Sequence, residues 1–201
     1  MKKVRGVTLI ELLITILVLS ILAGVAGPSF VESFKKRKVI SAAEEMYSYL
    51  QQARSESLAR SANIYLTVRG MTTTTWSYGL SYERNCNPNQ TSNISSTACV
   101  LTIDDGDGVF KDNPDDSTDK ADDNVIFRVD GTEHDDITMS LAIKSGSTKS
   151  FTIFDPARGT SNGARNFSFT NDEGKSVVVQ LSLLGTVKIC SNDYSEYKAC
   201  S

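Results

Sequence analysis

The sequence predicts an α+β fold in which a long N-terminal α-helix, membrane-spanning in its first half, packs against a head of antiparallel β-sheet. Three observations predict this fold. An apolar run follows a short basic start. Apolar residues then recur at three- and four-residue steps to about residue 62, which is typical of an amphipathic helix. After Asn63 the pattern has a period of two, which is typical of strands.

The composition excludes several classes of protein. The chain has 201 residues, enough for one globular domain of about 100–150 residues and an appendage. With 40% hydrophobic and 22% charged residues it is neither intrinsically disordered nor a polytopic membrane protein. Its formal net charge of −3 argues against a surface that coats nucleic acid, because such surfaces are basic.

The N-terminus predicts a single membrane anchor. A short basic segment ends at Gly6, and an apolar run follows from Val7 to Val31. Its uncharged part, Leu12 to Ala26, reaches with its flanks the roughly 20 residues that a bilayer core requires. A secretory signal peptide would have a shorter apolar region with its small-residue cleavage site behind it. By the positive-inside rule the basic start stays cytoplasmic and the rest of the chain is translocated.

Glu11 interrupts the apolar run. Insertion of a carboxylate into a membrane costs at least about 2.5 kcal/mol on insertion scales. An ionisable residue at such a position is therefore a candidate functional residue by default. One interpretation is a side chain near the helix end that reaches the headgroups. In the other interpretation Glu11 pairs with a cation, because cleavage after Gly6 would create an α-amino group at Val7. That amine would belong to the same chain or to a neighbouring subunit in an apolar bundle.

The string Gly6-Val7-Thr8-Leu9-Ile10-Glu11-Leu12-Leu13 resembles the class III signal of type IV pilins and type II secretion pseudopilins. The resemblance implies that a prepilin peptidase cleaves after Gly6 and removes a leader of residues 1–6. It also implies N-methylation of Val7, and it implies that Glu11 guides subunit docking. The sequence departs from the family at Val7, where Phe or Met is usual.

The helix is expected in two parts. Residues 7–29 form the transmembrane and filament-core helix, in which Pro28 predicts a local kink because proline removes a backbone donor. Residues 30–62 form the amphipathic part. The basic run Lys35 to Lys38 suits contact with lipid headgroups or acidic neighbours, and it suits a solvated helix face nearly as well.

Residues 63–201 are expected to form one β-rich periplasmic or extracellular head, with one or two antiparallel sheets on the second half of the helix. The expected strands are 64–68, 76–82, 100–103, 125–129, 151–154, 167–170 and 177–181.

The head resembles minor pilins of the FimT/FimU type and their pseudopilin H relatives. The resemblance rests on Gln51 to Ser57, on Trp76 with Gly79, on Asp104 to Phe110, on Phe154 to Gly159 and on a late strand from Leu184 to Cys190.

Four cysteines on the translocated side predict two disulfides in an oxidising compartment. Three pairings are possible, and the local one, Cys86–Cys99 with Cys190–Cys200, is favoured. Each loop would contribute something near 3 kcal/mol in the chain-entropy model. A metal site is the rival, but the sequence has no C-x-x-C motif and only one histidine.

An acidic segment runs from Asp104 to Asp136, and within it Asp105-Gly106-Asp107-Gly108, with Asp112 following, resembles half of a calcium loop. Like charges at this density repel unless a cation enters, and Ca²⁺ takes several carboxylate and carbonyl oxygens. Val109 occupies a ligand position, however, and no bidentate Glu closes the loop. A solvated turn is therefore favoured, with Ca²⁺ as the alternative cofactor. The candidate ligands are Asp104, Asp105, Asp107 and Asp112.

The sequence predicts no catalytic residues, because no Ser-His-Asp set, Cys-His set or phosphate loop is supported. The single histidine, His134, is interpreted as a surface residue. Arg158 and Arg165 lie in a glycine-bearing loop and Lys188 in the late strand, which makes them candidate contacts to DNA phosphates. With an acidic head, a structural turn is favoured over nucleic-acid binding.

Together these patterns predict a structural minor pilin subunit of a type IV pilus, held in the inner membrane with its head in the periplasm and then extracted into an extracellular pilus. Its expected partners are other pilins, a prepilin peptidase, the inner-membrane assembly platform and the membrane itself. The alternatives are a pseudopilin of a type II secretion system, a DNA-uptake pilin that binds DNA through its head, and a major pilin.

Overall fold

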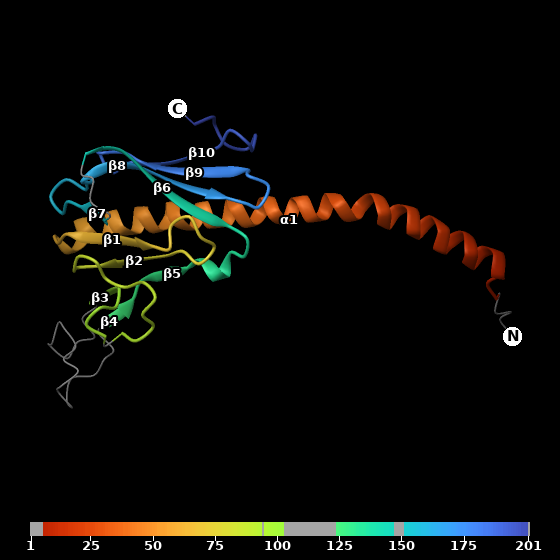
Figure 1. Cartoon of the computed structure of the whole chain (residues 1–201), viewed down its shortest axis with the longest axis horizontal. Helices are drawn as coiled ribbons and strands as arrows, with labels where there is room; N and C mark the ends of the chain where they lie inside the picture. Colours follow the sequence, from red (N-terminus) through yellow and green to blue (C-terminus); the bar gives the residue numbers. More distant parts are fainter. Residues whose placement is uncertain (1–5, 94, 103–123, 147–150, 201) are drawn as a thin grey trace, which may run out of the picture. The chain divides into compact units, whose positions relative to one another are not determined.

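The computed structural model describes residues 6–93, 95–102, 124–146 and 151–200. It contains two compact units, Met1–Arg37 and Lys38–Ser201, and the helix α1 (Leu9–Arg60) has residues in both. Figure 1 shows the strands that follow it. They are β1 (Ile64–Arg69), β2 (Ser77–Ser81), β3 (Val100–Thr102), β4 (Asn124–Ile126), β5 (Arg128–Asp130), β6 (Thr138–Gly146), β7 (Phe151–Phe154), β8 (Gly163–Thr170), β9 (Ser176–Leu181) and β10 (Val187–Cys190), with a short 3₁₀ helix η1 (Gly131–Glu133) after β5.

In the second unit, α1 buries one stripe of side chains. Neighbours in the stripe are three or four residues apart, the spacing that places side chains on one face of a helix. Several members are alanines, which allow the strands to approach the helix closely. The buried members are Val39, Ala42, Ala43, Met46, Tyr49, Leu50, Ala53 and Ser57.

The helix ends at Arg60 because the next residue leaves the helical conformation. Ser61 has a φ of 51°, in the left-handed region. The N–H of Ser61 donates to the carbonyl of Leu58 at 3.4 Å, and the N–H of Ala62 donates to the carbonyl of Ser57 at 3.2 Å. These two bonds form a Schellman motif, which stops the helix and turns the chain into β1.

Two four-stranded antiparallel sheets share one core with the second half of α1. The strand orders are β5-β2-β1-β7 and β10-β9-β8-β6, and β3 pairs with β4 separately. In Figure 1 the two sheets flank the C-terminal half of α1. Leu66 and Leu80, paired between β1 and β2, are fully buried, as are Phe167 and Phe169 of β8. All four belong to one hydrophobic cluster with the helix stripe, which confirms the expected α+β fold.

Two strands differ from the sequence-based expectation. The expected strand 125–129 is divided at Phe127, whose N–H donates to the Cys99 carbonyl and whose carbonyl accepts from the Leu80 N–H. The chain therefore pairs with β3 before Phe127 and with β2 after it. Strand β6 was not predicted, although Met139, Leu141 and Ile143 alternate with smaller or polar residues, which is the period of a strand.

Substitution of Leu50 tests whether the helix and the two sheets share one core. Leu50→Ala should lower the free energy of unfolding by about 2–5 kcal/mol, because the side chain is fully buried and its removal leaves a cavity. Urea denaturation of the detergent-solubilised chain measures the change. Leu183→Ala is the matched control, since Leu183 is 46% exposed and should change stability by less than about 0.5 kcal/mol. Equal effects of the two substitutions would contradict the shared core.

Candidate assembly interface

The N-terminus of α1 carries a reciprocal capping box. The N–H of Glu11 donates to Thr8 Oγ1 at 3.3 Å, and the N–H of Thr8 donates to Glu11 Oε2 at 3.5 Å. Each side chain thus accepts a bond from a backbone N–H that has no partner within the helix. The cap at Thr8 was not predicted, although the T-x-x-E spacing of Thr8 and Glu11 is its sequence signal. Glu11 is therefore held beside the backbone that directly follows the expected cleavage site between Gly6 and Val7.

Apolar side chains on the first turns of α1 lie on the surface of the chain. From Val7 to Leu22 the large apolar residues are between 48% and 78% exposed. Such a continuous apolar surface marks a site that a membrane or another protein covers, because its exposure to water is unfavourable. The segment is apolar all round, whereas the later part of α1 buries a single stripe.

A membrane anchor and a kink at Pro28 were both expected in the N-terminal part of α1. Within the part of the chain that the structure describes, no helix combines the length and mean hydropathy of a candidate membrane span. Position 28 lies inside the continuous helix α1, and the kink at Pro28 stays a prediction.

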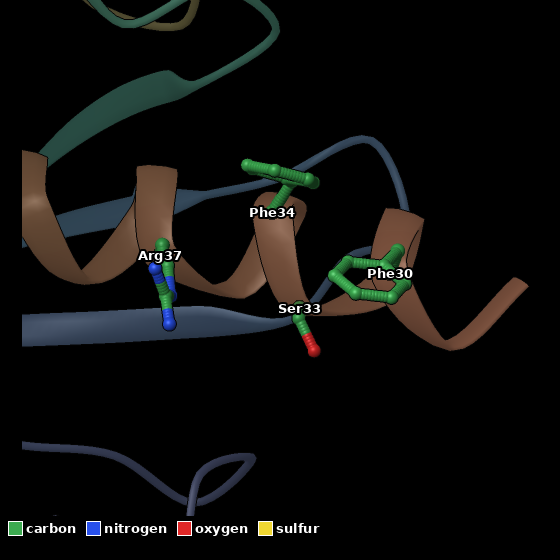
Figure 2. Close-up of a pocket in the computed structure, with 4 residues that line it drawn as sticks. All are labelled: Phe30, Ser33, Phe34 and Arg37. Atoms are coloured by element: carbon green, nitrogen blue, oxygen red, sulfur yellow. The ribbon is translucent and has the colours of Figure 1, made fainter. Parts of the chain in front are cut away.

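Two aromatic side chains project from α1 at the end of the apolar run and just after it. Figure 2 shows Phe30 and Phe34 on the helix with Ser33 and Arg37 beside them. The two rings are 64% and 61% exposed, and Arg37 is exposed as well. Aromatic rings next to a cation suit a boundary between an apolar and a polar environment. This short surface therefore continues the exposed face of the N-terminal segment with a more polar character.

Polar contacts attach α1 to the rest of the head. His134 Nε2 lies 2.8 Å from Glu45 Oε2, and the Tyr197 hydroxyl donates to Glu44 Oε1 at 2.9 Å. Partial burial, followed by the bond to Glu44, raises the pKa of Tyr197 to about 12. Instead of lying free on the surface, His134 is part-buried and stacks on Trp76, with ring centroids 5.8 Å apart. The single histidine thus has a structural role.

Asp130 holds the turn that leads to His134. Its carboxylate accepts bonds from the Thr132 N–H at 3.1 Å and from Thr132 Oγ1 at 3.0 Å, and it pairs with Arg128. These interactions, of which the bond from the Thr132 N–H is the largest, lower the pKa of Asp130. At least one acid of the acidic segment therefore serves as a helix cap.

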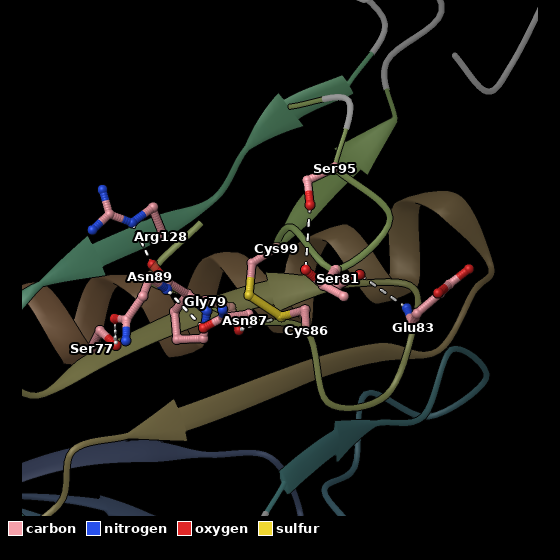
Figure 3. The surroundings of a disulfide bond; sticks show 12 residues. Ser77, Gly79, Ser81, Glu83, Cys86, Asn87, Asn89, Ser95, Cys99 and Arg128 are labelled. Atoms are coloured by element: carbon pink, nitrogen blue, oxygen red, sulfur yellow. Dashed lines mark hydrogen bonds between the residues drawn. A yellow bond between two sulfur atoms is a disulfide. The ribbon is translucent and has the colours of Figure 1, made fainter. Parts of the chain in front are cut away.

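The structure contains two disulfides, Cys86–Cys99 and Cys190–Cys200, which are the local pairs favoured by the sequence. Figure 3 shows the first against β2. Gly79 makes room for it, because a Cβ at that position would lie 2.5 Å from the Cβ of Cys99. The loop is also fixed by Arg128, whose Nε donates to the Pro88 carbonyl. The second disulfide attaches the C-terminal residues to β10.

The three expected phosphate contacts do not form a site. Arg158 and Lys188 are exposed, but Arg165 is fully buried, and its Nη2 donates to the Phe151 carbonyl at 2.9 Å. Burial lowers the pKa of Arg165. The expectation that Arg165 contacts DNA is therefore wrong: it lies on the inward-facing side of β8, where the alternation with Phe167 places it.

The candidate calcium ligands Asp104, Asp105, Asp107 and Asp112 lie outside the described residues. Among the residues that are described, no cluster of three or more His, Cys, Asp or Glu side chains is suited to hold a metal ion. The calcium site stays a prediction.

Two family models match the sequence. The one described as type II transport protein GspH matches residues 42–185, and the one described as prokaryotic N-terminal methylation motif matches residues 1–27. The first match covers the second half of α1 and most of the head, and the second covers the expected leader and apolar run. A comparison with curated proteins finds no match.

Two solved structures with similar folds are a minor pilin and a minor pseudopilin. The type IV minor pilin FimU of Pseudomonas aeruginosa has 18% sequence identity and a TM-score of 0.45, over 77% of this chain and 89% of that chain. The minor pseudopilin EpsH from the type 2 secretion system of Vibrio cholerae has 9% identity and a TM-score of 0.45, over 78% of this chain and 99% of that chain.

The disulfide beside β2 tests the attachment of its loop. Replacing Cys86 and Cys99 with serine should lower the free energy of unfolding by about 3 kcal/mol, because the open loop gains entropy in the unfolded chain. Urea denaturation measures the loss, and Ser92→Ala in the same loop is the control. If the double variant unfolded at the same urea concentration as the parent chain, the disulfide would not contribute to stability.

The cap at Asp130 predicts a pH dependence. Because its pKa is lowered on folding, the carboxylate stabilises the head above the ordinary Asp pKa of about 3.9, and this contribution is lost as the pH falls through the folded-state pKa. Asp130→Asn should therefore be less stable than the parent at pH 7, and the difference should shrink in strong acid. Denaturation at both pH values measures it, and a constant difference would contradict the cap's ionic character.

Proposed function

The chain belongs to the GspH family of type II transport proteins, and we propose that it is a structural minor pilin subunit of a type IV pilus. With its N-terminal methylation motif it is a pilin-like protein of a type IV pilus or a type II secretion system. Such a protein is processed by prepilin peptidase, assembles with other pilins and is structural rather than enzymatic.

The observation that carries the proposal is the exposed apolar surface of residues 7–22 next to the capped Glu11. In the proposal, residues 1–6 are the cleaved leader and residues 7–29 anchor the subunit in the inner membrane. An inner-membrane assembly platform then moves that helix from lipid into the core of the filament, where neighbouring helices cover the same apolar side chains. Residues 30–62 carry the head of residues 63–201 on the filament.

Glu11 sets the register of docking in this proposal. Its carboxylate already accepts the Thr8 N–H, so it faces the end of the helix where cleavage would leave the Val7 amine. Within the apolar bundle, the Glu11 carboxylate of one subunit would pair with the Val7 amine of its neighbour. An unpaired charge buried there would be costly, so only the register that pairs both groups is favourable.

A pseudopilin of a type II secretion system is the second candidate, favoured by the description of the matching family. Deletion of the gene separates the two functions. Loss of surface pili and of pilus-dependent motility, with normal secretion of exoproteins, supports the minor pilin. Loss of exoprotein secretion, with normal piliation, assigns the chain to the secretion system instead.

Substitution of Glu11 tests the docking step. Glu11→Gln keeps an acceptor for the capping box but removes the charge, and Glu11→Leu removes both. Each variant should be processed normally but incorporated into filaments at least about tenfold less, because the amine of the neighbour is left without its partner. Immunoblots of sheared filaments and of membranes measure incorporation and processing.

Glu133→Gln is the matched control, since Glu133 is an exposed carboxylate of the head and its loss should leave incorporation unchanged. Normal incorporation of both Glu11 variants would refute the docking role.

A further inference from the structure

The head has a pocket between the last turns of α1 and the turn that joins β9 to β10. Gln51, Arg54, Ser55 and Leu58 line its helix side, and Gly185 and Thr186 line the side of the turn. All of them lie in the second compact unit, and none takes part in the N-terminal interface. The lining combines one cation with hydroxyl, amide and apolar groups.

Arg54 is a cation without a partner in this pocket. Its Nε is buried and has no hydrogen-bond acceptor, and no ion pair joins its guanidinium to any described residue. Arg60, six residues further along the helix, differs, because it bonds to Glu56 at 2.6 Å and to the Tyr82 hydroxyl at 2.8 Å. A carboxylate that enters the pocket would pair with a guanidinium that no described acid neutralises, through charge-assisted hydrogen bonds.

Two glycine turns shape the pocket around Arg54. A Cβ at Gly159, which has a φ of 61°, would lie 2.8 Å from Arg54 Nε and 3.2 Å from a methyl carbon of Leu58. A Cβ at Gly185 would lie 1.9 Å from the Gly159 carbonyl oxygen and 3.3 Å from Arg54 Nε. Only glycine fits these close approaches at positive φ. The backbone of both turns therefore packs directly on the stem of the arginine.

Ser161 fixes the two turns to each other. Its N–H donates to the Leu183 carbonyl at 3.0 Å, and its hydroxyl donates to the Ser182 carbonyl at 2.8 Å. Asp155 closes the first turn by accepting the N–H groups of Ala157 and Arg158. The walls of the pocket are thus held by hydrogen bonds before any ligand arrives, which lowers the cost of binding.

The segments around the pocket carry exposed leucines and a second arginine. Leu58, which lines the pocket, is 43% exposed, and Leu184, which precedes the lining residue Gly185 in the chain, is 71% exposed. Arg158, next to Gly159, is exposed and has no side-chain partner among the described residues. An arginine in a pocket with exposed leucines beside it is typical of a protein contact, in which a few anchor residues fill pockets and neighbouring contacts exclude water around them.

We propose that this pocket binds a carboxylate side chain of a partner protein, seated on Arg54 and flanked by apolar residues that cover Leu58 and Leu184. The ligand class follows from the unpartnered guanidinium, which pairs with carboxylates through charge-assisted hydrogen bonds. The identity of the partner rests on the proposed function: in a filament it is a neighbouring pilin subunit.

Nuclear magnetic resonance of the ¹⁵N-labelled full chain in detergent tests the pocket. The probe is the peptide N-acetyl-Leu-Glu-Leu-amide, and its Gln counterpart is the matched control. The Arg54 Nε–H signal should shift saturably with the Glu peptide, and the Gln peptide should bind at least about tenfold more weakly, because it lacks the charge. Inorganic phosphate at equal ionic strength should not displace the Glu peptide.

Substitutions at Arg54 and Thr186 test the pocket in chains that should still fold. Arg54→Gln should abolish the preference for the Glu peptide, whereas Arg69→Gln, an exposed arginine on β1, should not change it. Thr186→Glu places a carboxylate at the rim, where it should occupy Arg54 and block the peptide in a chain that melts at the parental temperature.

Equal binding of both peptides, an unchanged Arg54 signal, or displacement by phosphate would overturn the proposal. None of these results depends on filament assembly, so failure of the pocket leaves the proposed function standing. Conversely, a chain that did not enter filaments but bound the Glu peptide would retain the pocket and lose only the pilin partner.

Discussion

The packing of the second half of α1 against two sheets is the constraint on which the head depends. Among the described residues, buried apolar side chains of both sheets belong to one hydrophobic cluster with the helix stripe. The alanines of the stripe allow close approach, and Met46 and Leu50 fill the space between. The Schellman motif at Ser61 ends the helix where the stripe ends, so the first strand begins directly beside the surface that it covers.

The helix, the disulfide pairs and most strands were predictable because each leaves a local signal in the sequence. A period of 3.6 marks the helix stripe, and cysteines at short spacing mark the loops. Interactions between distant residues leave no such signal. The burial of Arg165 follows from a strand pairing, and the role of His134 from a contact with Glu45 across the fold. The capping box at Thr8 and strand β6 were not predicted, although each has a local signal: the T-x-x-E spacing for the cap and a period of two for the strand.

Two parts of one helix meet different environments. From Lys38 onward a single stripe is covered by the chain's own sheets, whereas the large apolar residues from Val7 to Leu22 are exposed in the chain. In a soluble monomer that surface would promote aggregation. For a subunit that passes from a lipid bilayer to a filament it is a requirement, since both environments cover it. The capped carboxylate at Glu11 adds a polar group that distinguishes one packing register from another.

The start of the mature polypeptide tests this account most directly, because everything proposed for the helix requires removal of the basic leader. Mass spectrometry of the membrane-extracted chain is expected to give a first residue of Val7 carrying an N-methyl group, and cells without prepilin peptidase should retain Met1. A chain that begins at Met1 in cells with an active peptidase would contradict the account.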